Sequence, residues 1–231
     1  MVVGGGDGTL IAAIDGIRRA GVPLAILPLG TTNDLARTLA LPFGIIPACS
    51  LVDDGRLRAI DVGCANDVWF FNEASIGMST HVVREQTERL KRLLGMLAIP
   101  VGTLRALRFM RPYHLTVKWD GGERTFRTVQ LTIANSGRFG GYVENPRAAI
   151  DDGLLDLYSI DIRRPWDALE IIIAVLRKQF SSTRNVTTIS AKSFTITSLH
   201  RHHVSADGED AGMTPAEFKV IPHALEVLVP A

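Results

Sequence analysis

The residues that point most directly to chemistry stand at the start of the chain, in the run GGGDGT at residues 4–9. The run follows the apolar pair Val2-Val3 and precedes a helix-like stretch that ends near Ala20. Glycines let backbone N–H groups come close to a bound phosphate, and a following helix adds its positive N-terminal end. The run therefore predicts phosphate binding, and a glycine-rich turn without a ligand is the alternative.

A second turn of the same type lies at residues 26–37, with the sequence ILPLGTTNDLAR. An apolar strand again leads to a glycine, then to polar capping residues, then to a helix. Two such turns place donors at the same edge of a parallel sheet, where ligands of open α/β sheets bind. The chain has no G-x-x-x-x-G-K-[ST] motif and no H-R-D or D-F-G set, and its early glycines do not fit G-x-G-x-x-G.

Composition narrows the class of protein. The chain has 231 residues, enough for one large domain or two modest ones, and 46% of them are hydrophobic, which excludes a disordered chain. A net charge of +1 gives no support for a nucleic-acid binder. Cys49 and Cys64 have no metal-ligand spacing, and we expect buried thiols in a reducing, cytoplasmic compartment. Apolar stretches at 93–104 and 171–176 are too short or too broken to span a bilayer, so any membrane contact is expected to be peripheral, at the inner face of the membrane.

The pattern of hydrophobic and polar residues changes near residue 56. Strand and helix alternate over residues 1–55, whereas a hairpin is predicted over 113–133, where apolar and polar residues alternate around the turn at Asp120. Further strands are expected at 154–160, 186–197, 216–221 and 225–229. Two helical segments interrupt them, one at 81–110 with a break near Pro100, and one that opens at Pro165 and has Trp166, Leu169, Ile173 and Leu176 on one face.

Four motifs together resemble those of the bacterial diacylglycerol kinases and related lipid kinases, which are distant relatives of sphingosine kinases. The motifs are GGGDGT at 4–9, LPLGTTND at 27–34, DDGLLD at 151–156 and DGE at 207–209, in the order that this family has them. The first alone also occurs in NAD kinases and phosphofructokinases. The resemblance implies a truncated Rossmann-like α/β domain over 1–55 and a β-rich sandwich domain over 56–223. It also implies an ATP cleft between them and a C-terminal segment, 224–231, that packs back on the first domain.

The resemblance also assigns roles to residues. ATP would be the phosphoryl donor and a lipid hydroxyl, such as that of diacylglycerol, the acceptor. Glu209 would be the general base and Asp7 would touch the catalytic Mg²⁺, since a carboxylate beside phosphate-binding amides would otherwise repel the ligand. A solvated turn residue is the alternative for Glu209, and a helix-capping aspartate is the alternative for Asp7. The residues expected to line the nucleotide site are Gly5, Gly6, Asp7, Gly8, Thr9, Thr31 and Asn33.

A structural Mg²⁺ is implied at the third motif. Matching positions give the carboxylate of Asp152 and the backbone carbonyls of Ala149 and Leu154 as ligands. Mg²⁺ accepts few protein ligands and keeps several waters, so this set is chemically reasonable. A plain turn closed by Asp152 and Gly153 remains the alternative.

Two further features suggest partners. Basic residues outnumber acidic ones within 84–111, beside several leucines, so this helical segment could dock on anionic lipid, although a solvated helix face explains it equally well. The dipeptide Asn72-Glu73 is similar to one used by NAD kinases, but its place after the apolar stretch 68–71 also suits an ordinary strand end.

The chain departs from the family in two places. Ile11 and Ala12 stand where family members usually have Asn-Glu, and the chain begins almost on the glycine loop. We therefore expect a fragment, a misassigned start or a degenerate copy, whose exposed sheet edge favours association, a homodimer included, or instability. An ATP-dependent lipid kinase is the first hypothesis. An NAD kinase-like enzyme and an inactive nucleotide- or lipid-binding remnant are the alternatives.

Overall fold

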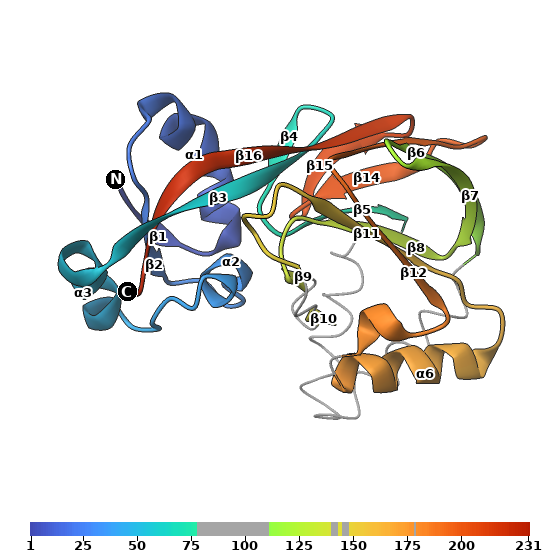
Figure 1. The fold of residues 1–231 in the computed structure, drawn as a ribbon, viewed down its shortest axis with the longest axis horizontal. Coiled ribbons are helices and arrows are strands. Elements are labelled where there is room, and N and C mark those ends of the chain that lie inside the picture. The colour runs from blue at the N-terminus through green and yellow to red at the C-terminus, as the bar shows by residue number, and fades with distance from the viewer. Residues whose placement is uncertain (78–110, 140–142, 145–147, 178) are drawn as a thin grey trace.

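Strand and helix alternate at the start of the chain and build a small α/β part (Figure 1). The computed structural model describes residues 1–77, 111–139, 143–144, 148–177 and 179–231. In the α/β part β1 pairs with β2 in parallel, and α1 buries Leu10, Ile14 and Ile17 before it ends at the left-handed Gly21. Its elements are β1 (Val2–Gly5), α1 (Asp7–Ala20), β2 (Ala25–Pro28), α2 (Asp34–Thr38) and α3 (Ile45–Asp54).

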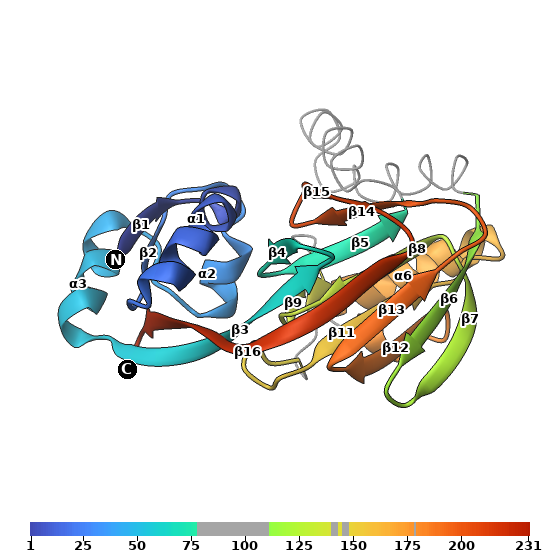
Figure 2. The ribbon, with the colours of Figure 1, turned by 90° about the horizontal axis from the view of Figure 1, so that it is seen from above.

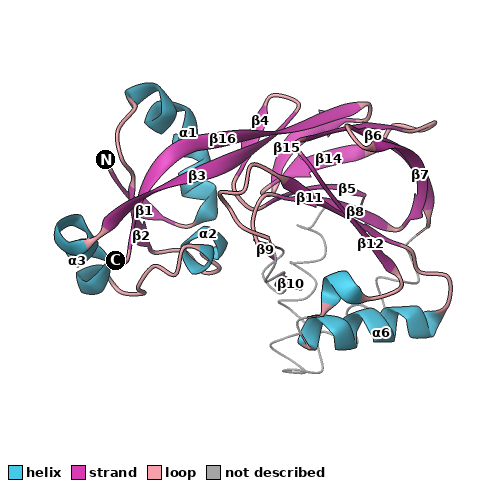
Figure 3. Ribbon diagram, viewed as in Figure 1, coloured by secondary structure: helices cyan, strands magenta, loops and turns pink. Residues whose placement is uncertain are grey.

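The rest of the described chain is dominated by two antiparallel sheets of six strands each, which Figure 3 shows as a layered body beside the α/β part. One sheet has the order β4-β3-β16-β13-β6-β7 and the other β12-β11-β8-β5-β14-β15. The strands of the first sheet are β3 (Arg56–Ala65), β4 (Val68–Phe70), β6 (Tyr113–Trp119), β7 (Gly122–Thr128), β13 (Ser193–Thr197) and β16 (Ala216–Val229). Those of the second are β5 (Glu73–Gly77), β8 (Gln130–Ala134), β11 (Leu155–Ile160), β12 (Val186–Ala191), β14 (His203–Ala206) and β15 (Glu209–Met213). The predicted fold class, an α/β part followed by a β-rich sandwich, is confirmed.

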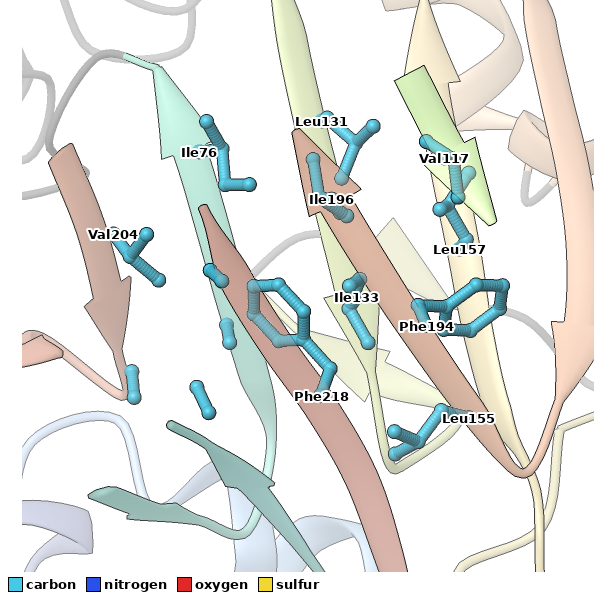
Figure 4. Close-up of a cluster of buried hydrophobic side chains, with 14 of the residues drawn as sticks. Ile76, Val117, Leu131, Ile133, Leu155, Leu157, Phe194, Ile196, Val204 and Phe218 are labelled. Atoms are coloured by element: carbon cyan, nitrogen blue, oxygen red, sulfur yellow. The ribbon is translucent and has the colours of Figure 1, made fainter. Parts of the chain in front are cut away.

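The main core lies between the two sheets. Alternate residues of each strand point inward, as the period of a half-buried strand requires. Phe194, Ile196 and Phe218 of the first sheet meet Ile133 and Leu157 of the second, and all five are at most 1% exposed (Figure 4). At this burial an aromatic side chain is worth several times a hydrogen bond, so the sandwich is held mainly by apolar packing.

A long two-stranded ribbon, β3 with β16, connects the sandwich with the α/β part (Figure 2). Phe218 and Val220 of β16 belong to the sandwich core, whereas Leu225 and Val227 belong to a second cluster with α1 and β2. Leu24 joins this cluster through backbone hydrogen bonds with Glu226 and Leu228, at 2.8 and 2.9 Å. The segments predicted at 216–221 and 225–229 are thus one strand, interrupted by a register shift between Ile221 and Leu225.

Four further elements complete the described structure. They are the short pair β9 (Arg138–Phe139) and β10 (Val143–Glu144), the helix α6 (Pro165–Leu176) and the single turn η2 (Phe180–Ser182). α6 covers the outer side of the second sheet, where Ile171 and Val175 pack on a cluster that includes Tyr158 and Phe180. The face of α6 that holds Trp166, Leu169 and Ile173 points to solvent instead. Among the described helices, none has both the length and the apolar character needed to cross a membrane.

Two sequence-based predictions need correction, and a third falls outside the described residues. Cys64 is buried as expected, but the prediction of a buried Cys49 is wrong, because α3 turns only Ala48 and Leu51 inward. The strand predicted at 186–197 is two strands, β12 and β13, which belong to different sheets. The helical segment predicted at 81–110 lies outside the described residues.

Candidate functional site

The first phosphate-binding candidate is the beginning of α1. Gly6 is its N-cap, in extended backbone conformation, and no side chain caps this end. The carbonyl of Gly6 accepts hydrogen bonds from the backbone of Thr9 and Leu10, at 3.0 and 3.2 Å. The N–H groups at the start of a helix have no partner within the helix, and here they follow a run of glycines without side chains. This end of α1 therefore suits an anion.

The second glycine turn packs directly on the first. A Cβ placed on Gly30 would lie 2.4 Å from Cα of Gly6 and 2.7 Å from Oδ1 of Asn33, so a side chain larger than hydrogen does not fit. Asn33 closes the turn with two hydrogen bonds: its Oδ1 accepts from the backbone N–H of Gly30 at 3.0 Å, and its Nδ2 donates to the carbonyl of Gly30 at 2.8 Å. In the structure Asn33 thus shapes the loop.

Asp7 connects the two turns. Its two carboxylate oxygens accept hydrogen bonds from the backbone of Asp34 at 3.0 Å and of Leu35 at 3.1 Å. The carboxylate therefore caps α2, the helix after the second turn, and not the helix on which it stands. Each oxygen uses one lone pair in these bonds and retains another for a cation. Capping and metal binding are compatible roles for this side chain.

The remaining predicted nucleotide residues lie on the same two turns. Gly5 and Gly6 are partly buried, whereas Gly8 and Thr9 are exposed at the start of α1. Thr31 is exposed on the second turn, next to Gly30. The structure thus brings all seven predicted residues into two adjoining loops, with Gly8, Thr9 and Thr31 open to solvent.

The DGE motif forms the hairpin turn between β14 and β15. Asp207 and Gly208 have positive φ angles of 45° and 94°, which is the conformation that two-residue hairpin turns favour. The Asp207 carboxylate accepts hydrogen bonds from three consecutive backbone N–H groups, those of Phe71 (2.6 Å), Asn72 (3.1 Å) and Glu73 (2.9 Å). Asp207 thereby fixes the hairpin to the link between β4 and β5.

The environment of the same carboxylate raises its pKa. Burial raises the pKa of Asp207 to about 6, the three backbone N–H groups oppose that rise, and the negative charge of Asp7 adds to it. The geometric link between the hairpin and the first glycine turn is β4, which contacts α1, the helix that begins at Asp7, and both hairpin strands, β14 and β15.

Glu209, the predicted general base, lies two residues beyond Asp207. It begins β15 opposite Ala206, and its side chain is exposed. An exposed carboxylate on a turn that the half-buried Asp207 fixes has the freedom to meet a substrate hydroxyl. Glu209 thus stands on the hairpin that Asp207 fixes to the link between β4 and β5.

Asn72 is a further candidate for the site, since its sequence context fits both an NAD kinase-like dipeptide and an ordinary strand end. Its side chain is 4% exposed, and within the described part of the chain Oδ1 has no hydrogen-bond partner. Buried polar atoms nearly always have a partner, so this oxygen is an acceptor for a ligand or a water beside Asp207. The Asn72-Glu73 dipeptide was the available signal. Its link to Asp207 was hidden by a separation of 135 residues.

The predicted Mg²⁺ turn has a different character. The Asp152 carboxylate accepts hydrogen bonds from the backbone of Ala149 at 3.3 Å and of Leu154 at 2.9 Å, and its side chain is exposed. The carboxylate thus closes its own turn while it stays open to water, which suits an ion that keeps most of its waters. In the described ranges, no cluster of three or more His, Cys, Asp or Glu side chains could hold a metal. A site here would depend on one carboxylate and carbonyl oxygens, as the resemblance implies.

Asp61 connects this turn with the ribbon. Its carboxylate is 1% exposed and accepts hydrogen bonds from the backbone of Gly153 at 2.7 Å and of His223 at 2.8 Å. His223 stands in the register shift of β16, with a positive φ of 51°. The buried carboxylate therefore holds the 149–154 turn against the strand that passes from one core to the other.

The fold and the candidate site define a class: a two-part protein with glycine-rich turns at the starts of two helices in an α/β part and an acidic hairpin in the adjoining β-sandwich. Two family models match the chain, the diacylglycerol kinase catalytic domain over residues 1–65 and the YegS C-terminal NAD kinase beta sandwich-like domain over residues 72–229. The chain belongs to the diacylglycerol kinase family.

Individual relatives agree with this assignment. A diacylglycerol kinase of Staphylococcus haemolyticus is 31% identical over 236 residues, which cover 100% of this chain and 71% of the relative. The diacylglycerol kinase of Bacillus subtilis is 26% identical over 100% of this chain and 77% of its own length. A crystal structure from Bacillus anthracis, of a protein assigned as a diacylglycerol kinase, superposes with a TM-score of 0.80 at 25% identity, over 99% of this chain and 76% of that one.

Proposed function

We propose that this protein is an ATP-dependent lipid kinase that transfers the γ-phosphate of ATP to a lipid hydroxyl, such as that of diacylglycerol. The observation that supports it is the place of the Asp207 hairpin, which bears Glu209. Asp207 fixes this hairpin to the end of β4, and β4 contacts α1, the helix that begins at Asp7. Phosphoryl transfer asks a protein mainly for positioning and for electrostatic stabilisation. A donor-rich turn and an acidic hairpin, both beside β4, would supply both.

The residues divide this work. The uncapped N–H groups of α1 and the adjoining Gly30 turn would hold the phosphates of ATP. Glu209 would accept the proton of the acceptor hydroxyl, since it is exposed on a turn that Asp207 fixes. Mg²⁺ would neutralise phosphate charge when bound, and the free lone pairs of the Asp7 carboxylate fit it.

The experiment that tests the proposal is the substitution Glu209→Gln. We expect phosphate transfer from radiolabelled ATP to a dispersed short-chain diacylglycerol to fall by roughly 10² to 10⁴, because the amide cannot accept the proton. Binding of ATP, measured by calorimetry, should stay unchanged, since Glu209 lies outside the glycine turns.

Asp210→Asn is the matched control, because Asp210 is the next residue, equally exposed, and contacts His203 at 3.0 Å. Turnover of this variant should resemble that of the unmodified protein. Near-normal turnover of Glu209→Gln would remove this residue from the mechanism. Transfer to NAD but not to any lipid alcohol would contradict the proposed substrate class.

A further inference from the structure

We infer that α6 is a docking helix that seats the sandwich on an anionic phospholipid bilayer through Trp166, Leu169 and Ile173. This inference deepens the proposed function and rests on it, since a lipid acceptor requires the protein to reach a membrane surface. Its physical basis is independent of the kinase site: an exposed apolar stripe and the basic residues around it.

The stripe lies on the outer face of α6. Trp166 is 56%, Leu169 54% and Ile173 40% exposed, at spacings of three and four residues that place them on one side of a helix. The opposite side packs on the second sheet and buries Ala168 and Ala174. α6 is thus apolar on both sides, whereas a helix with one face in water normally has polar residues there.

Basic residues flank both ends of the stripe. Arg163 and Arg164 precede the helix and Arg177 follows it, and all three are exposed. The guanidinium of Arg164 lies 5.4 Å from the centre of the Trp166 ring, so the cation and the aromatic side chain lie next to each other on the surface. Trp with Arg beside aliphatic residues is the composition of helices that lie in a membrane interface.

The acidic residues of this region are turned away or paired. Asp167 is buried and accepts hydrogen bonds from the backbone of Arg163 and Arg164, at 3.0 and 2.9 Å. Glu170 pairs with Arg184 at 2.9 Å, and Asp161 pairs with Arg163 at 2.8 Å. The outward charge around the stripe is therefore positive, which an anionic lipid surface complements.

A second copy of the chain fits this surface less well. Two α6 stripes packed against each other would bring the arginines of one copy near those of the other, and like charges repel. The helix also lies on the outer side of the sandwich, away from α1, α2 and α3 (Figures 1 and 3). A flat bilayer can reach it there without contacting the α/β part.

The test measures sedimentation of the full chain with vesicles. One set contains phosphatidylcholine alone and the other equal parts of phosphatidylcholine and phosphatidylglycerol. The variant Trp166→Gln/Leu169→Gln/Ile173→Gln should bind the anionic vesicles at least roughly tenfold more weakly, because the apolar area that enters the lipid is lost. Arg164→Gln/Arg177→Gln should weaken binding to anionic vesicles roughly fivefold per arginine and leave binding to phosphatidylcholine unchanged.

The matched control is Ile45→Gln/Ile46→Gln/Val52→Gln on α3. These residues are 61%, 84% and 55% exposed, but α3 ends in Asp53 and Asp54 and has no basic residue in its last turn. This variant should bind vesicles like the unmodified protein. Trp166→Phe should abolish the blue shift of tryptophan emission that vesicles cause, which assigns the contact to α6 and not to the other tryptophans.

The outcomes separate this inference from the proposed function. Equal binding of the α6 variant and the unmodified protein overturns the docking surface, as does a dimer, seen by light scattering, that dissociates when the stripe is changed. Transfer of phosphate to a short-chain diacylglycerol without vesicles should be the same in both proteins. Loss of vesicle binding in the variant supports the docking helix even where neither protein transfers phosphate.

Discussion

Asp207→Asn converts the pKa of one half-buried carboxyl into a measurable dependence of stability on pH. The carboxyl has a pKa of about 6 in the folded protein, against an ordinary value of 3.8, because burial and the charge of Asp7 disfavour ionisation more than three backbone N–H groups favour it. The folded state therefore holds this proton more tightly than the unfolded state does.

The sign and the size of the change in the free energy of unfolding follow from the linkage between proton binding by Asp207 and folding. Below pH 3.8 the carboxyl is protonated in both states and its ionisation costs nothing. Between pH 3.8 and about 6 the folded state binds more protons than the unfolded one, so the free energy of unfolding falls as the pH rises. Above about pH 6 the ionised carboxylate lowers the free energy of unfolding by at most about 3 kcal/mol. This value is an upper limit because Asp207 keeps some exposure to solvent.

The assay is urea unfolding of the unmodified protein and of Asp207→Asn from about pH 4.5 to about pH 7.5. Over this range the difference between their free energies of unfolding should change by up to about 2 kcal/mol. The amide of Asn is neutral throughout, and any hydrogen bond lost with it contributes equally at each pH. The stability of the unmodified protein relative to Asp207→Asn should thus decline across this range. Asp120→Asn, in the exposed turn between β6 and β7, is the control and should show no such trend. A constant difference, or one that grows with pH, refutes the electrostatic account of this carboxyl.

Two further predictions concern the turns. Gly30→Ala should destabilise the fold by about 1–3 kcal/mol in urea unfolding and weaken ATP binding in calorimetry, since its Cβ would meet the backbone of Gly6 at 2.4 Å, whereas Gly16→Ala, with open space around it, should not destabilise. An unchanged midpoint for Gly30→Ala would show that the turns separate freely. Asp152→Ala should reduce the rise in melting temperature that added Mg²⁺ causes, because an ion bound only to the folded state stabilises it by mass action. Identical Mg²⁺ titrations of the two proteins would make the 149–154 segment an ordinary turn.

Local patterns explain what could be predicted from the sequence. The helix after the glycine run was recognisable from Leu10, Ile14 and Ile17, which have helical spacing and are all buried. The turn at Asp120 and Gly121 was equally recognisable from the alternation in β6. The strand expected after it at 129–133 was wrong as the hairpin partner, because β7 pairs with β6 and β8 belongs to the other sheet. For α1 and for β6 the spacing of hydrophobic residues within one short segment is sufficient for the prediction.

Two kinds of feature could not be predicted. The first are contacts between residues far apart in the sequence, and the second is the side of α6 that packs on the sheet. The Asp207 carboxylate meets the backbone of Phe71 across 136 positions, and Asp61 meets Gly153 across 92. No spacing rule connects such pairs. In α6 nearly every position is apolar, so the pattern predicts a helix but does not say which side faces the sheet.

The ribbon of β3 and β16 makes the two parts of this molecule interdependent in folding. A division between residues 65 and 72, where the two family models meet, would leave β3 with the first piece and β16, its hydrogen-bonded neighbour, with the second. Each piece would expose a long unpaired strand, and the first would lose Leu225 and Val227 from its apolar cluster. The boundary between the two family models is therefore not a boundary between two units that could fold independently. Loss of the pairing between β3 and β16 would weaken both cores, because β16 contributes buried side chains to each.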